Sequence, residues 1–283
     1  TIPNTNLPSI INLNEAVSHH LALLGVTGSG KSFLAREIIK SLKTDTNVIC
    51  IDFTGEYKTD LEELNPIELI KVDGLSSLEE TFAEKHEKAL NKRPSEELAL
   101  KKKIQGQLDD YVKEFIEGEE NLGLFELPAL SNTSFILEFT QFFIESVFNY
   151  AKVNKGSRVC LVLEEAHTIV PETNFLGDLG DYGSSKALVN KMSQIALQGR
   201  KYGVGLMVIA QRTANVSKTV LTQCNSIICF QAFDETSFTF LGNYIGKDLV
   251  QALPNLKQYH AIVTGKAIRS NIPMIVNLER DIE

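Results

Sequence analysis

The stretch that decides the fold is LALLGVTGSGKSFLAREI, which runs from Leu21 to Ile38. It begins with apolar residues, passes through three glycines and a lysine, and continues with apolar residues at helical spacing. This order predicts a buried strand, a loop and an amphipathic helix. Because the loop fits the pattern G-x-x-x-x-G-K-[ST], we expect it to bind nucleotide phosphates; the alternative is a glycine turn beside an unrelated lysine.

The expected chemistry of this loop comes mainly from its backbone. Glycines permit the torsion angles that point successive N–H groups into one concavity, and the next helix begins there with unpaired N–H groups and a positive dipole end. Lys31 would reach the β- and γ-phosphates of ATP, and the hydroxyl of Ser32 would bind Mg²⁺. The predicted nucleotide-binding residues are Gly25, Thr27, Gly28, Ser29, Gly30, Lys31, Ser32 and Phe33.

Composition limits the class of protein. The chain has 283 residues, of which 43% are hydrophobic, and it contains no apolar run near the roughly 18 residues that span a membrane. Its net charge is −8, so any surface for nucleic acid has to be local, such as the lining of a pore. Its four cysteines lie mostly in apolar runs, which predicts buried thiols in a reducing compartment, the cytoplasm, and neither disulfides nor a zinc site.

Apolar segments that read as strands alternate with helical segments along the chain, which predicts an α/β fold with a parallel sheet covered on both faces. The strands expected after the loop are 47–53, 68–73, 158–167, 204–212, 226–232, 260–265 and 272–278, and long helices are expected at 131–152 and 184–203. We interpret residues 1–283 as a single domain with a helical insertion at about 76–130, whose two exposed helices are broken near Pro94. The three lysines at 101–103 are interpreted as a solvated helical face, with contact to DNA phosphates as the alternative.

Two acidic residues follow the buried strand that starts at Val159. Glu164 and Glu165 would lie at its carboxyl end, where ligands bind in open α/β sheets. One acid can hold Mg²⁺ through a water molecule, and the next can position the attacking water, so we assign Glu164 to the metal and Glu165 to the water. The alternative is a strand end with solvated acids.

Two further polar residues flank the strand at 204–212. Gln211 ends it with an amide that can hydrogen-bond a γ-phosphate or the attacking water, or it is an ordinary polar residue at a strand end. Arg200 precedes the strand. It is either a partner of a helix dipole or an arginine finger that reaches the nucleotide of a neighbouring subunit. The second possibility would make hydrolysis depend on assembly.

The sequence resembles the HerA branch of the HerA/FtsK superfamily of hexameric ATPases over roughly 14–278. The resemblance is carried, in the order of that family, by HHLALLGVTGSGKS, CIDFTGEY, LVLEEAH, GRKYGVGLMVIAQR and VLTQCNSIICF. It implies a RecA-like (ASCE P-loop NTPase) sheet in which the Gln211 strand lies between the strand of the phosphate loop and the strand of the two acids. It further implies a hexameric ring that hydrolyses ATP between subunits and pumps duplex DNA through its channel.

By position in these motifs, the resemblance assigns roles to individual residues. Lys31 and Ser32 match the phosphate and Mg²⁺ residues, Glu165 the catalytic acid, Gln211 the sensor and Arg200 the trans finger. Asp52, Glu56 and Tyr57 match a motif that we expect near the nucleotide or the subunit interface. Family members usually also carry an N-terminal β-barrel and C-terminal bracing helices, for which this sequence leaves no room. We therefore expect a fragment or a minimal version.

The leading functional hypothesis is an ATP-hydrolysing ring motor that moves duplex DNA and acts with a partner nuclease or effector, in DNA end processing or antiviral defence. Loops 171–185 and 212–219 are candidates for DNA contact, and the second is favoured because Arg212 and Lys218 can meet phosphates non-specifically. The alternative is an ATP-gated oligomeric scaffold that activates a partner enzyme without moving DNA. A third possibility is a monomeric ATPase or a small-molecule kinase.

Overall fold

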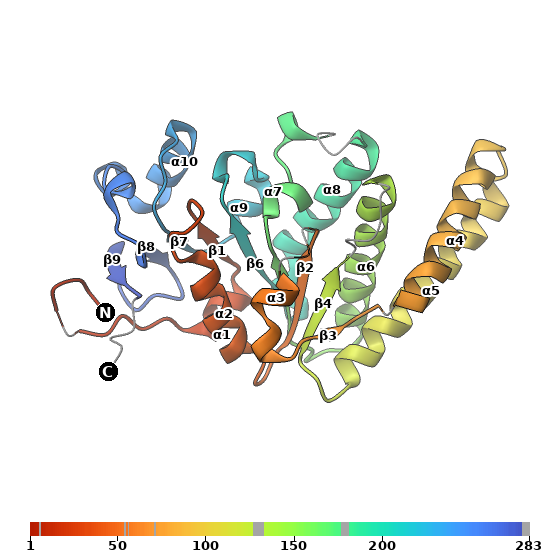
Figure 1. The fold of residues 1–283 in the computed structure, drawn as a ribbon, viewed down its shortest axis with the longest axis horizontal. Coiled ribbons are helices and arrows are strands. Elements are labelled where there is room, and N and C mark those ends of the chain that lie inside the picture. The colour runs from red at the N-terminus through yellow and green to blue at the C-terminus, as the bar shows by residue number, and fades with distance from the viewer. Residues whose placement is uncertain are drawn as a thin grey trace.

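The computed structural model describes residues 1–5, 7–53, 55, 57–70, 72–126, 133–176 and 181–278, with the side chains of residues 72, 73 and 133 excepted. Within this part of the chain a single nine-stranded sheet runs through the molecule in the order β3-β4-β2-β5-β6-β1-β7-β8-β9 (Figure 1). The strands are β1 (Leu21–Leu24), β2 (Asn47–Asp52), β3 (Ile67–Glu68), β4 (Leu122–Glu126), β5 (Val159–Leu163), β6 (Val204–Ala210), β7 (Ser226–Cys229), β8 (His260–Gly265) and β9 (Met274–Asn277).

Helices cover both faces of the sheet. They are α1 (Leu13–Ser18), α2 (Lys31–Leu42), α3 (Tyr57–Asp60), α4 (Val72–Leu90), α5 (Pro94–Glu117), α6 (Thr133–Val153), α7 (Ala166–Ile169), α8 (Tyr182–Gln198), α9 (Lys218–Leu221), α10 (Glu235–Ile245) and α11 (Lys247–Val250). Short 3₁₀ turns are η1 (Glu62–Leu64), η2 (Thr173–Phe175), η3 (Gly199–Tyr202), η4 (Thr213–Asn215) and η5 (Leu253–Asn255). None of the described helices has the combination of length and apolar character that crossing a membrane requires.

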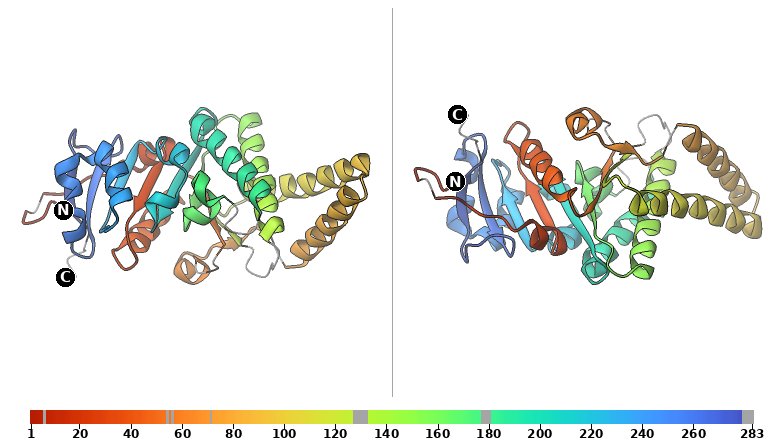
Figure 2. Two further views of the ribbon diagram at one scale, coloured as in Figure 1. Left: turned by 90° about the horizontal axis from the view of Figure 1, so that it is seen from above. Right: turned by 90° about the horizontal axis from the view of Figure 1, so that it is seen from below.

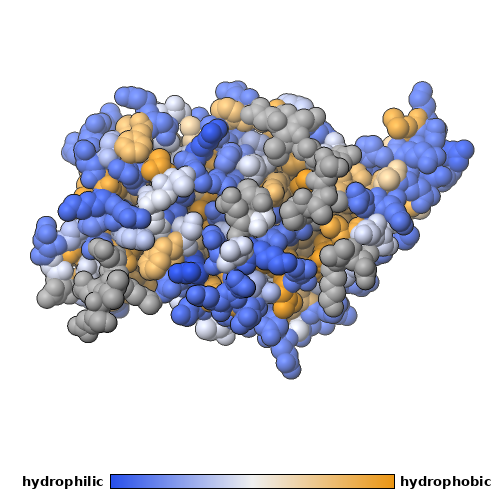
Figure 3. All heavy atoms as spheres, in the orientation of Figure 1, coloured by the Kyte–Doolittle hydropathy of each residue, from blue (hydrophilic) through white to orange (hydrophobic). Residues whose placement is uncertain are grey.

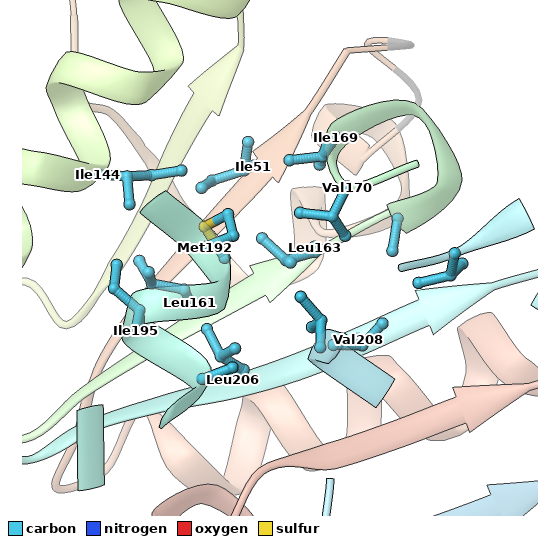
Figure 4. Packing of buried hydrophobic residues seen from close by; sticks show 14 of the residues in the cluster. Ile51, Ile144, Leu161, Leu163, Ile169, Val170, Met192, Ile195, Leu206 and Val208 are labelled. Carbon is cyan, nitrogen blue, oxygen red and sulfur yellow. The ribbon is translucent and has the colours of Figure 1, made fainter. Parts of the chain in front are cut away.

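The alternation of side chains along the strands divides the core in two. In β1, Leu21 and Leu23 face the cluster that contains the apolar stripe of α2, whereas Ala22 and Leu24 face the cluster built with α6 and α8. Figure 4 shows the second cluster, in which residues of β2, β5 and β6 pack against Met192 of α8. Because both faces are covered, β1, β5 and β6 carry no polar side chain at any position, as expected for parallel strands in the middle of a sheet.

Side-chain caps fix where several helices begin. Asp181 accepts a hydrogen bond from the Ser184 N–H at 3.0 Å and starts α8, and Asp234 accepts one from the Ser237 N–H at 2.7 Å and starts α10. Pro94 occupies the first position of α5, where its missing N–H costs no helical hydrogen bond. These local signals explain why the helices begin where they do.

The order of the central strands confirms the predicted topology. Strand β6, which ends just before Gln211, pairs in parallel with both β1 and β5 and so separates the strand of the phosphate loop from the strand of the acids. The predicted parallel arrangement is wrong at one edge, where β7 and β8, and then β8 and β9, pair antiparallel.

Two other predictions differ from the structure. The strand expected at 68–73 is only Ile67–Glu68, because the chain from Val72 onward joins the long helix α4, whose Leu78 and Phe82 pack into the core at helical spacing. Strand β4 lies inside the stretch 76–130 that the sequence predicts as a helical insertion, and it pairs with β2 throughout its length. The strand is only five residues long and is preceded by a run rich in glutamate. Its apolar pattern is therefore too short to be recognised as a strand in the sequence.

Helices α4 and α5 form an antiparallel hairpin that extends from one end of the sheet, as both views of Figure 2 show. The prediction of two helices broken near Pro94 is confirmed. The buried ammonium of Lys85 in α4 makes an ion pair with Glu138 of α6, and the Gln105 amide in α5 donates to the Phe142 carbonyl at 3.1 Å. On the face drawn in Figure 3, the surface of the hairpin is largely hydrophilic.

Candidate nucleotide-binding and hydrolysis site

The loop between β1 and α2 has the conformation that its glycines allow. Gly25 and Gly30 adopt φ angles of +147° and +112°, and Gly30 is the residue that caps α2. A Cβ atom on Gly25 would lie 2.6 Å from Phe230 Cβ, and one on Gly30 would lie 2.8 Å from Tyr259 Cδ1. Glycine is therefore required at both positions, for its torsion angles and for the space.

Lys31 is held inside this loop. Its side chain is only 5% exposed, and its ammonium donates a hydrogen bond to the Val26 carbonyl at 2.9 Å. Burial lowers the pKa of Lys31, and the charges of Glu165 and Glu164 act in the opposite direction. The lysine thus lies between the loop backbone and the two acids, which is where a phosphate chain held by the loop would be.

Glu164 follows β5 and is half-buried at the carboxyl end of the sheet. Burial raises its pKa to about 8; the Tyr57 hydroxyl lowers the pKa in part, and the charges of Glu165 and Asp52 raise it further. Among the described residues, Glu164 Oε2 has no hydrogen-bond partner of good geometry. This buried oxygen therefore has no well-formed hydrogen bond, although the nearby Tyr57 hydroxyl stabilises the carboxylate in part.

Glu165 has an unusual backbone and several polar contacts. It adopts the left-handed conformation at φ 44° and ψ 51°, which turns the chain from β5 into α7. Its carboxylate accepts a hydrogen bond from the Gln211 amide, and its Oε2 lies 3.1 Å from His167 Nδ1. Burial acts to raise the pKa of Glu165, but His167 and the charge of Lys31 outweigh it, and the pKa lies below its ordinary value.

Gln211 connects these acids to the phosphate loop. The Thr27 hydroxyl donates to its Oε1 at 2.5 Å, while its amide nitrogen donates to Glu165. Thr27, Glu165 and Gln211 come from segments after β1, β5 and β6, which are adjacent in the sheet. The structure therefore brings together the loop, both acids and Gln211, as the sequence predicted.

The Asp-x-x-Gly-Glu-Tyr motif lies next to Glu164. Asp52 ends β2 fully buried, and its carboxylate accepts a hydrogen bond from the Tyr57 N–H at 2.9 Å. Burial raises the pKa of the Tyr57 hydroxyl well above its usual range, so the hydroxyl stays protonated beside Glu164. Glu56, the third predicted residue of this motif, lies outside the described residues.

The donor set fits a magnesium ion. Ser32 and Glu164 line the same cavity, and Glu164 contributes a buried oxygen without a hydrogen-bond partner. In the described part of the chain no group of three or more His, Cys, Asp or Glu residues could hold a metal alone. Mg²⁺ commonly takes one or two protein oxygens and completes its shell with water and phosphate, so this set is sufficient.

Arg200 is not part of this cluster. It lies in η3, at the amino end of β6, exposed beside a small cavity lined by Asn14, Arg158 and Gly203. Strand β6 has seven residues, so at about 3.3 Å per residue its two ends are roughly 20 Å apart. Within one chain, Arg200 therefore cannot reach the phosphate loop.

Sequence reasoning missed two residues of the site. Gln258 and Tyr259 line a cavity of about 200 Å³ together with the phosphate loop, although more than half of the chain separates them from it in sequence. The Tyr259 N–H donates to the Ser29 carbonyl at 3.0 Å, and the Tyr259 ring contacts that of Phe33. No motif marks either residue, and only the return of the chain before β8 places them here.

The two loops proposed for DNA contact are joined to each other. The Glu172 N–H donates to the Asn215 carbonyl at 2.7 Å, and the Lys218 N–H donates to the Glu172 carboxylate at 2.7 Å. Arg212 and Lys218 are both exposed. Residues 177–180 of the first loop lie outside the described residues. The two segments follow β5 and β6, so they share the edge of the sheet that holds the phosphate loop.

The four cysteines agree with the prediction from the sequence. Cys50, Cys160, Cys224 and Cys229 are all buried as free thiols. Burial raises the pKa of Cys160 and of Cys224 to about 12.

Comparisons with known sequences agree with the resemblance seen in the motifs. The family model described as helicase HerA, central domain, matches residues 1–81. A probable helicase of Methanocaldococcus jannaschii is 26% identical over 95% of this chain and 68% of its own length. The DNA double-strand break repair helicase HerA of Pyrococcus furiosus is 23% identical over 98% of this chain and 67% of its own length. The chain thus spans about two thirds of the length of these relatives.

Solved structures share the fold. VirB4 of Thermoanaerobacter pseudethanolicus is similar with a TM-score of 0.59 at 16% identity, covering 92% of this chain and 89% of its own. The genome packaging NTPase B204 from Sulfolobus turreted icosahedral virus 2, in complex with ATP-gammaS, gives a TM-score of 0.56 at 15% identity, covering 91% and 96%. Together with the geometry of the loop and the acids, these likenesses support an ATPase that is similar to the HerA helicases and has the fold of the P-loop NTPases.

Proposed function

We propose that the chain is the ATP-hydrolysing part of a ring motor of the HerA type that moves duplex DNA. The observation that carries this proposal is the contact chain from Thr27 through Gln211 to Glu165, which couples the phosphate loop to an acid on a neighbouring strand. A simple binding site has no need for a carboxylate linked to the loop through an amide. Such a link serves an enzyme that must sense the γ-phosphate and activate water beside it.

In this proposal, the residues divide the work of hydrolysis. The loop backbone and Lys31 bind the phosphates, and Glu165 takes the proton of the water that attacks the γ-phosphorus, as the bond to the bridging oxygen breaks and ADP leaves. Ser32 and Glu164 would hold Mg²⁺, which offsets charge on the phosphate oxygens when bound. Gln211 orients the water or the γ-phosphate.

The position of Arg200 supports a shared active site. Its exposed guanidinium lies at the opposite edge of the sheet from its own phosphate loop, so any nucleotide that it serves is bound by another subunit. In a ring, a guanidinium at one face meets a triphosphate at the facing edge of the next subunit, where it stabilises transition-state charge. We therefore propose a homo-oligomer, a hexamer by resemblance, whose turnover depends on assembly.

DNA contact is proposed for the joined loops at the carboxyl edge of the sheet. Exposed Arg212 and Lys218 would meet the backbone phosphates of duplex DNA in the central channel, without reading its sequence. The relatives named as DNA repair helicases support this substrate. A partner nuclease or effector, in end processing or antiviral defence, completes the proposal, in a reducing compartment such as the cytoplasm, which the buried free thiols fit.

Mixed-subunit kinetics test the shared site. We expect Glu165→Gln to lower turnover by about 10² to 10⁴ and Arg200→Ala by about 10³ or more. Mixing the two inactive variants should restore part of the activity, since a mixed ring contains interfaces with an intact acid and an intact arginine. Arg36→Ala, a change in α2 outside the site, is the control. Full activity of Arg200→Ala, or a single-chain mass in the presence of ATP, contradicts the ring and favours a monomeric ATPase.

The alternative of an ATP-gated scaffold is favoured by the net charge of −8 and by Glu172, which binds the backbone beside Lys218. ATPase rates with and without duplex DNA separate the two functions. A motor is stimulated by duplex DNA, and the stimulation weakens in Arg212→Ala and Lys218→Ala. If Glu165→Gln still binds ATP and still activates the partner enzyme, the scaffold replaces the motor.

A further inference from the structure

Helix α5 carries its charges in two separate blocks. Between positions 90 and 103, at the tip of the hairpin and in the first half of α5, the chain has five basic and two acidic residues. The other end of α5 is acidic. Glu114 and Glu117 lie in its last turn, which has no basic residue, and Glu119 and Glu120 follow it. Because acids are unfavourable at the negative end of a helix dipole, a cationic partner would stabilise this end.

A groove lies beside the acidic end of α5. It is a cavity of about 410 Å³ between α5 and the edge strand β3. Leu69 and Phe115 are buried in its lining, whereas Glu114, Glu119 and Glu120 are exposed. The groove therefore has an apolar floor and an acidic rim. Within the part of the chain that the structure describes, none of these three acids forms an ion pair.

The tip of the hairpin has a surface that is complementary to this groove. Leu90 and Leu98 are 80% and 53% exposed, and hydrophobic atoms are visible among hydrophilic ones at the far end of the hairpin in Figure 3. Lys92, Lys102 and Lys103 are exposed as well, and Lys102 lies one helical turn after Leu98. A surface that binds only phosphates has no use for exposed leucines, whereas an apolar groove with an acidic rim matches both leucines and lysines.

We propose that the hairpin tip of one copy of this chain docks in the groove of a second copy. A tip cannot reach its own groove, because Leu98 and Glu114 are sixteen residues, or about 24 Å, apart on one continuous helix. The docking rests on the proposed homo-oligomer and names the surfaces that join its copies. Leu90 and Leu98 would cover the groove floor, and the lysines of the tip would meet the acids of the rim.

The two parts of this contact have different roles. Burial of the two leucines supplies most of the affinity, because removing apolar surface from water is favourable. Exposed ion pairs add little affinity but select the partner and the register, since like charges placed opposite each other are unfavourable. The tip and the groove are different surfaces, so the contact runs head to tail. Repeated contacts of this kind form a ring when the rotation closes.

Complementary charge reversals test the contact. One variant carries Lys102→Glu/Lys103→Glu, and the other carries Glu119→Lys/Glu120→Lys. We expect each variant alone to associate on the order of 100-fold more weakly than the wild-type chain with ATP present, because like charges then face each other. An equal mixture should recover the assembled mass, since every tip then finds a groove of opposite charge. Analytical ultracentrifugation measures the masses, and Lys247→Glu/Lys266→Glu, away from the hairpin, is the control.

A second variant tests the apolar part without changing any charge. Leu90→Ser/Leu98→Ser should weaken association, whereas its urea midpoint should not fall at concentrations where the chains are single, because both leucines are exposed in one chain. Ile272→Ser, at a residue that is 71% exposed beside β9, is the control and should leave association unchanged. A loss of stability in the single chain that accounts for the weaker association would show that the leucines support the hairpin and do not dock.

The outcomes separate this docking from the proposed function. If the wild-type chain stays single with ATP, the proposed ring fails and the docking fails with it. If the wild-type chain assembles but both charge-reversed variants assemble equally well, or their mixture recovers nothing, the docking is wrong and the ring is held by other surfaces. If Lys102→Glu/Lys103→Glu keeps its assembled mass and loses affinity for duplex DNA, the lysines contact DNA and the docking is wrong.

Discussion

Gln211 donates a hydrogen bond from its amide to the carboxylate of Glu165, and its carbonyl oxygen accepts the Thr27 hydroxyl at 2.5 Å. The residue that would sense the γ-phosphate therefore binds the acid that would activate water. As long as this contact lasts, one oxygen of Glu165 accepts a hydrogen bond from the amide, which lowers its basicity toward water. A γ-phosphate that draws the Gln211 amide away would free that oxygen, so binding and activation share one side chain.

Removing the amide tests this coupling. We expect Gln211→Leu to lower kcat by about 10² to 10³ with little change in ATP affinity, because a polar contact made in the transition state is lost while the loop keeps its donors. Thr27→Val should cost less, since Gln211 keeps its contact with Glu165. Steady-state kinetics, combined with equilibrium binding of ATP, measure both. The exposed Gln251, changed to leucine, is the matched control, and an unchanged kcat in Gln211→Leu would refute the coupling.

Two glycines in opposite environments, one in the phosphate loop and one in α5, allow the effect of an added methyl group to be compared. Gly30 has a φ of +112°, and an added methyl would meet the Tyr259 ring at 2.8 Å. Gly106, inside α5, has no atom within 4 Å of an added methyl. We expect Gly30→Ala to lower the free energy of unfolding by about 1 kcal/mol or more and to weaken ATP binding, because the loop must distort. Gly106→Ala should raise the unfolding free energy by about 0.5 to 1 kcal/mol, because alanine favours the helix.

Chemical denaturation and nucleotide titration of the two alanine variants decide the point. A Gly30→Ala protein that binds ATP like the wild type would mean that the loop tolerates a side chain at its cap, and that the tight approach of Tyr259 to the start of α2 is wrong. Stabilisation in Gly106→Ala without any change in ATP affinity would show that the α4–α5 hairpin and the site respond independently.

The sequence predicted those parts of the fold whose own residues form a clear apolar pattern. The buried strands at 47–53 and 204–212 and the helix at 131–152 are long, apolar and periodic, so burial on the two faces of the sheet left a readable pattern. Strand β4 was missed because five residues after a glutamate-rich helix carry too little pattern, and because its stability comes from pairing with β2, at a distance of about seventy residues.

The candidate site divides in the same way. Lys31, Glu164 and Gln211 each follow a buried strand, so parallel pairing brings them to one edge, and the sequence sufficed to predict their proximity. Tyr259 has no such signal. It reaches the loop only because the chain returns to it before β8, and its backbone hydrogen bond to Ser29 is a tertiary contact without a motif.

His20 makes the stability of the chain depend on pH. It is buried before β1, where its Nδ1 accepts a hydrogen bond from the Leu206 N–H at 3.0 Å and its Nε2 donates to the Ala196 carbonyl at 2.9 Å. Burial lowers the pKa of His20 to about 4. The unfolded chain, with an ordinary pKa near 6.5, therefore binds a proton between these values that the folded chain does not.

The unfolding free energy should accordingly lose about 3 kcal/mol from this residue as the pH falls from about 6.5 to 4, and nothing above that range. In His20→Gln, which stays neutral, this loss disappears, although the variant is less stable at pH 8. Urea denaturation from pH 4 to 8 gives the difference between the two curves. His86→Gln, at an exposed histidine of α4, serves as the control. Parallel curves for wild type and His20→Gln would show that burial does not hold His20 neutral.

The buried ion pair between Lys85 and Glu138 joins the hairpin to α6. We expect either charge without the other to destabilise the fold, and removal of both charges to be tolerated. Lys85 is 5% exposed and Glu138 16%, and the Lys85 ammonium also lies 4.5 Å from the centroid of the Phe82 ring. We expect Lys85→Met alone to lower the unfolding free energy by about 3 kcal/mol, because it leaves a buried carboxylate without its partner. The double variant Lys85→Met/Glu138→Leu should recover most of this loss, since two apolar side chains can fill the same space.

Lys101→Met, which breaks the exposed pair with Glu97, is the matched control and should change stability by less than about 0.5 kcal/mol. Thermal and urea unfolding of the four proteins measure these differences, and ATPase assays then ask whether the hairpin communicates with the site. Lys85→Met is far from the phosphate loop, so turnover by the folded fraction should be unchanged if the hairpin only supports the sheet. A double variant as unstable as Lys85→Met would mean that the charges themselves, and not the compensation of one by the other, hold α4 against α6.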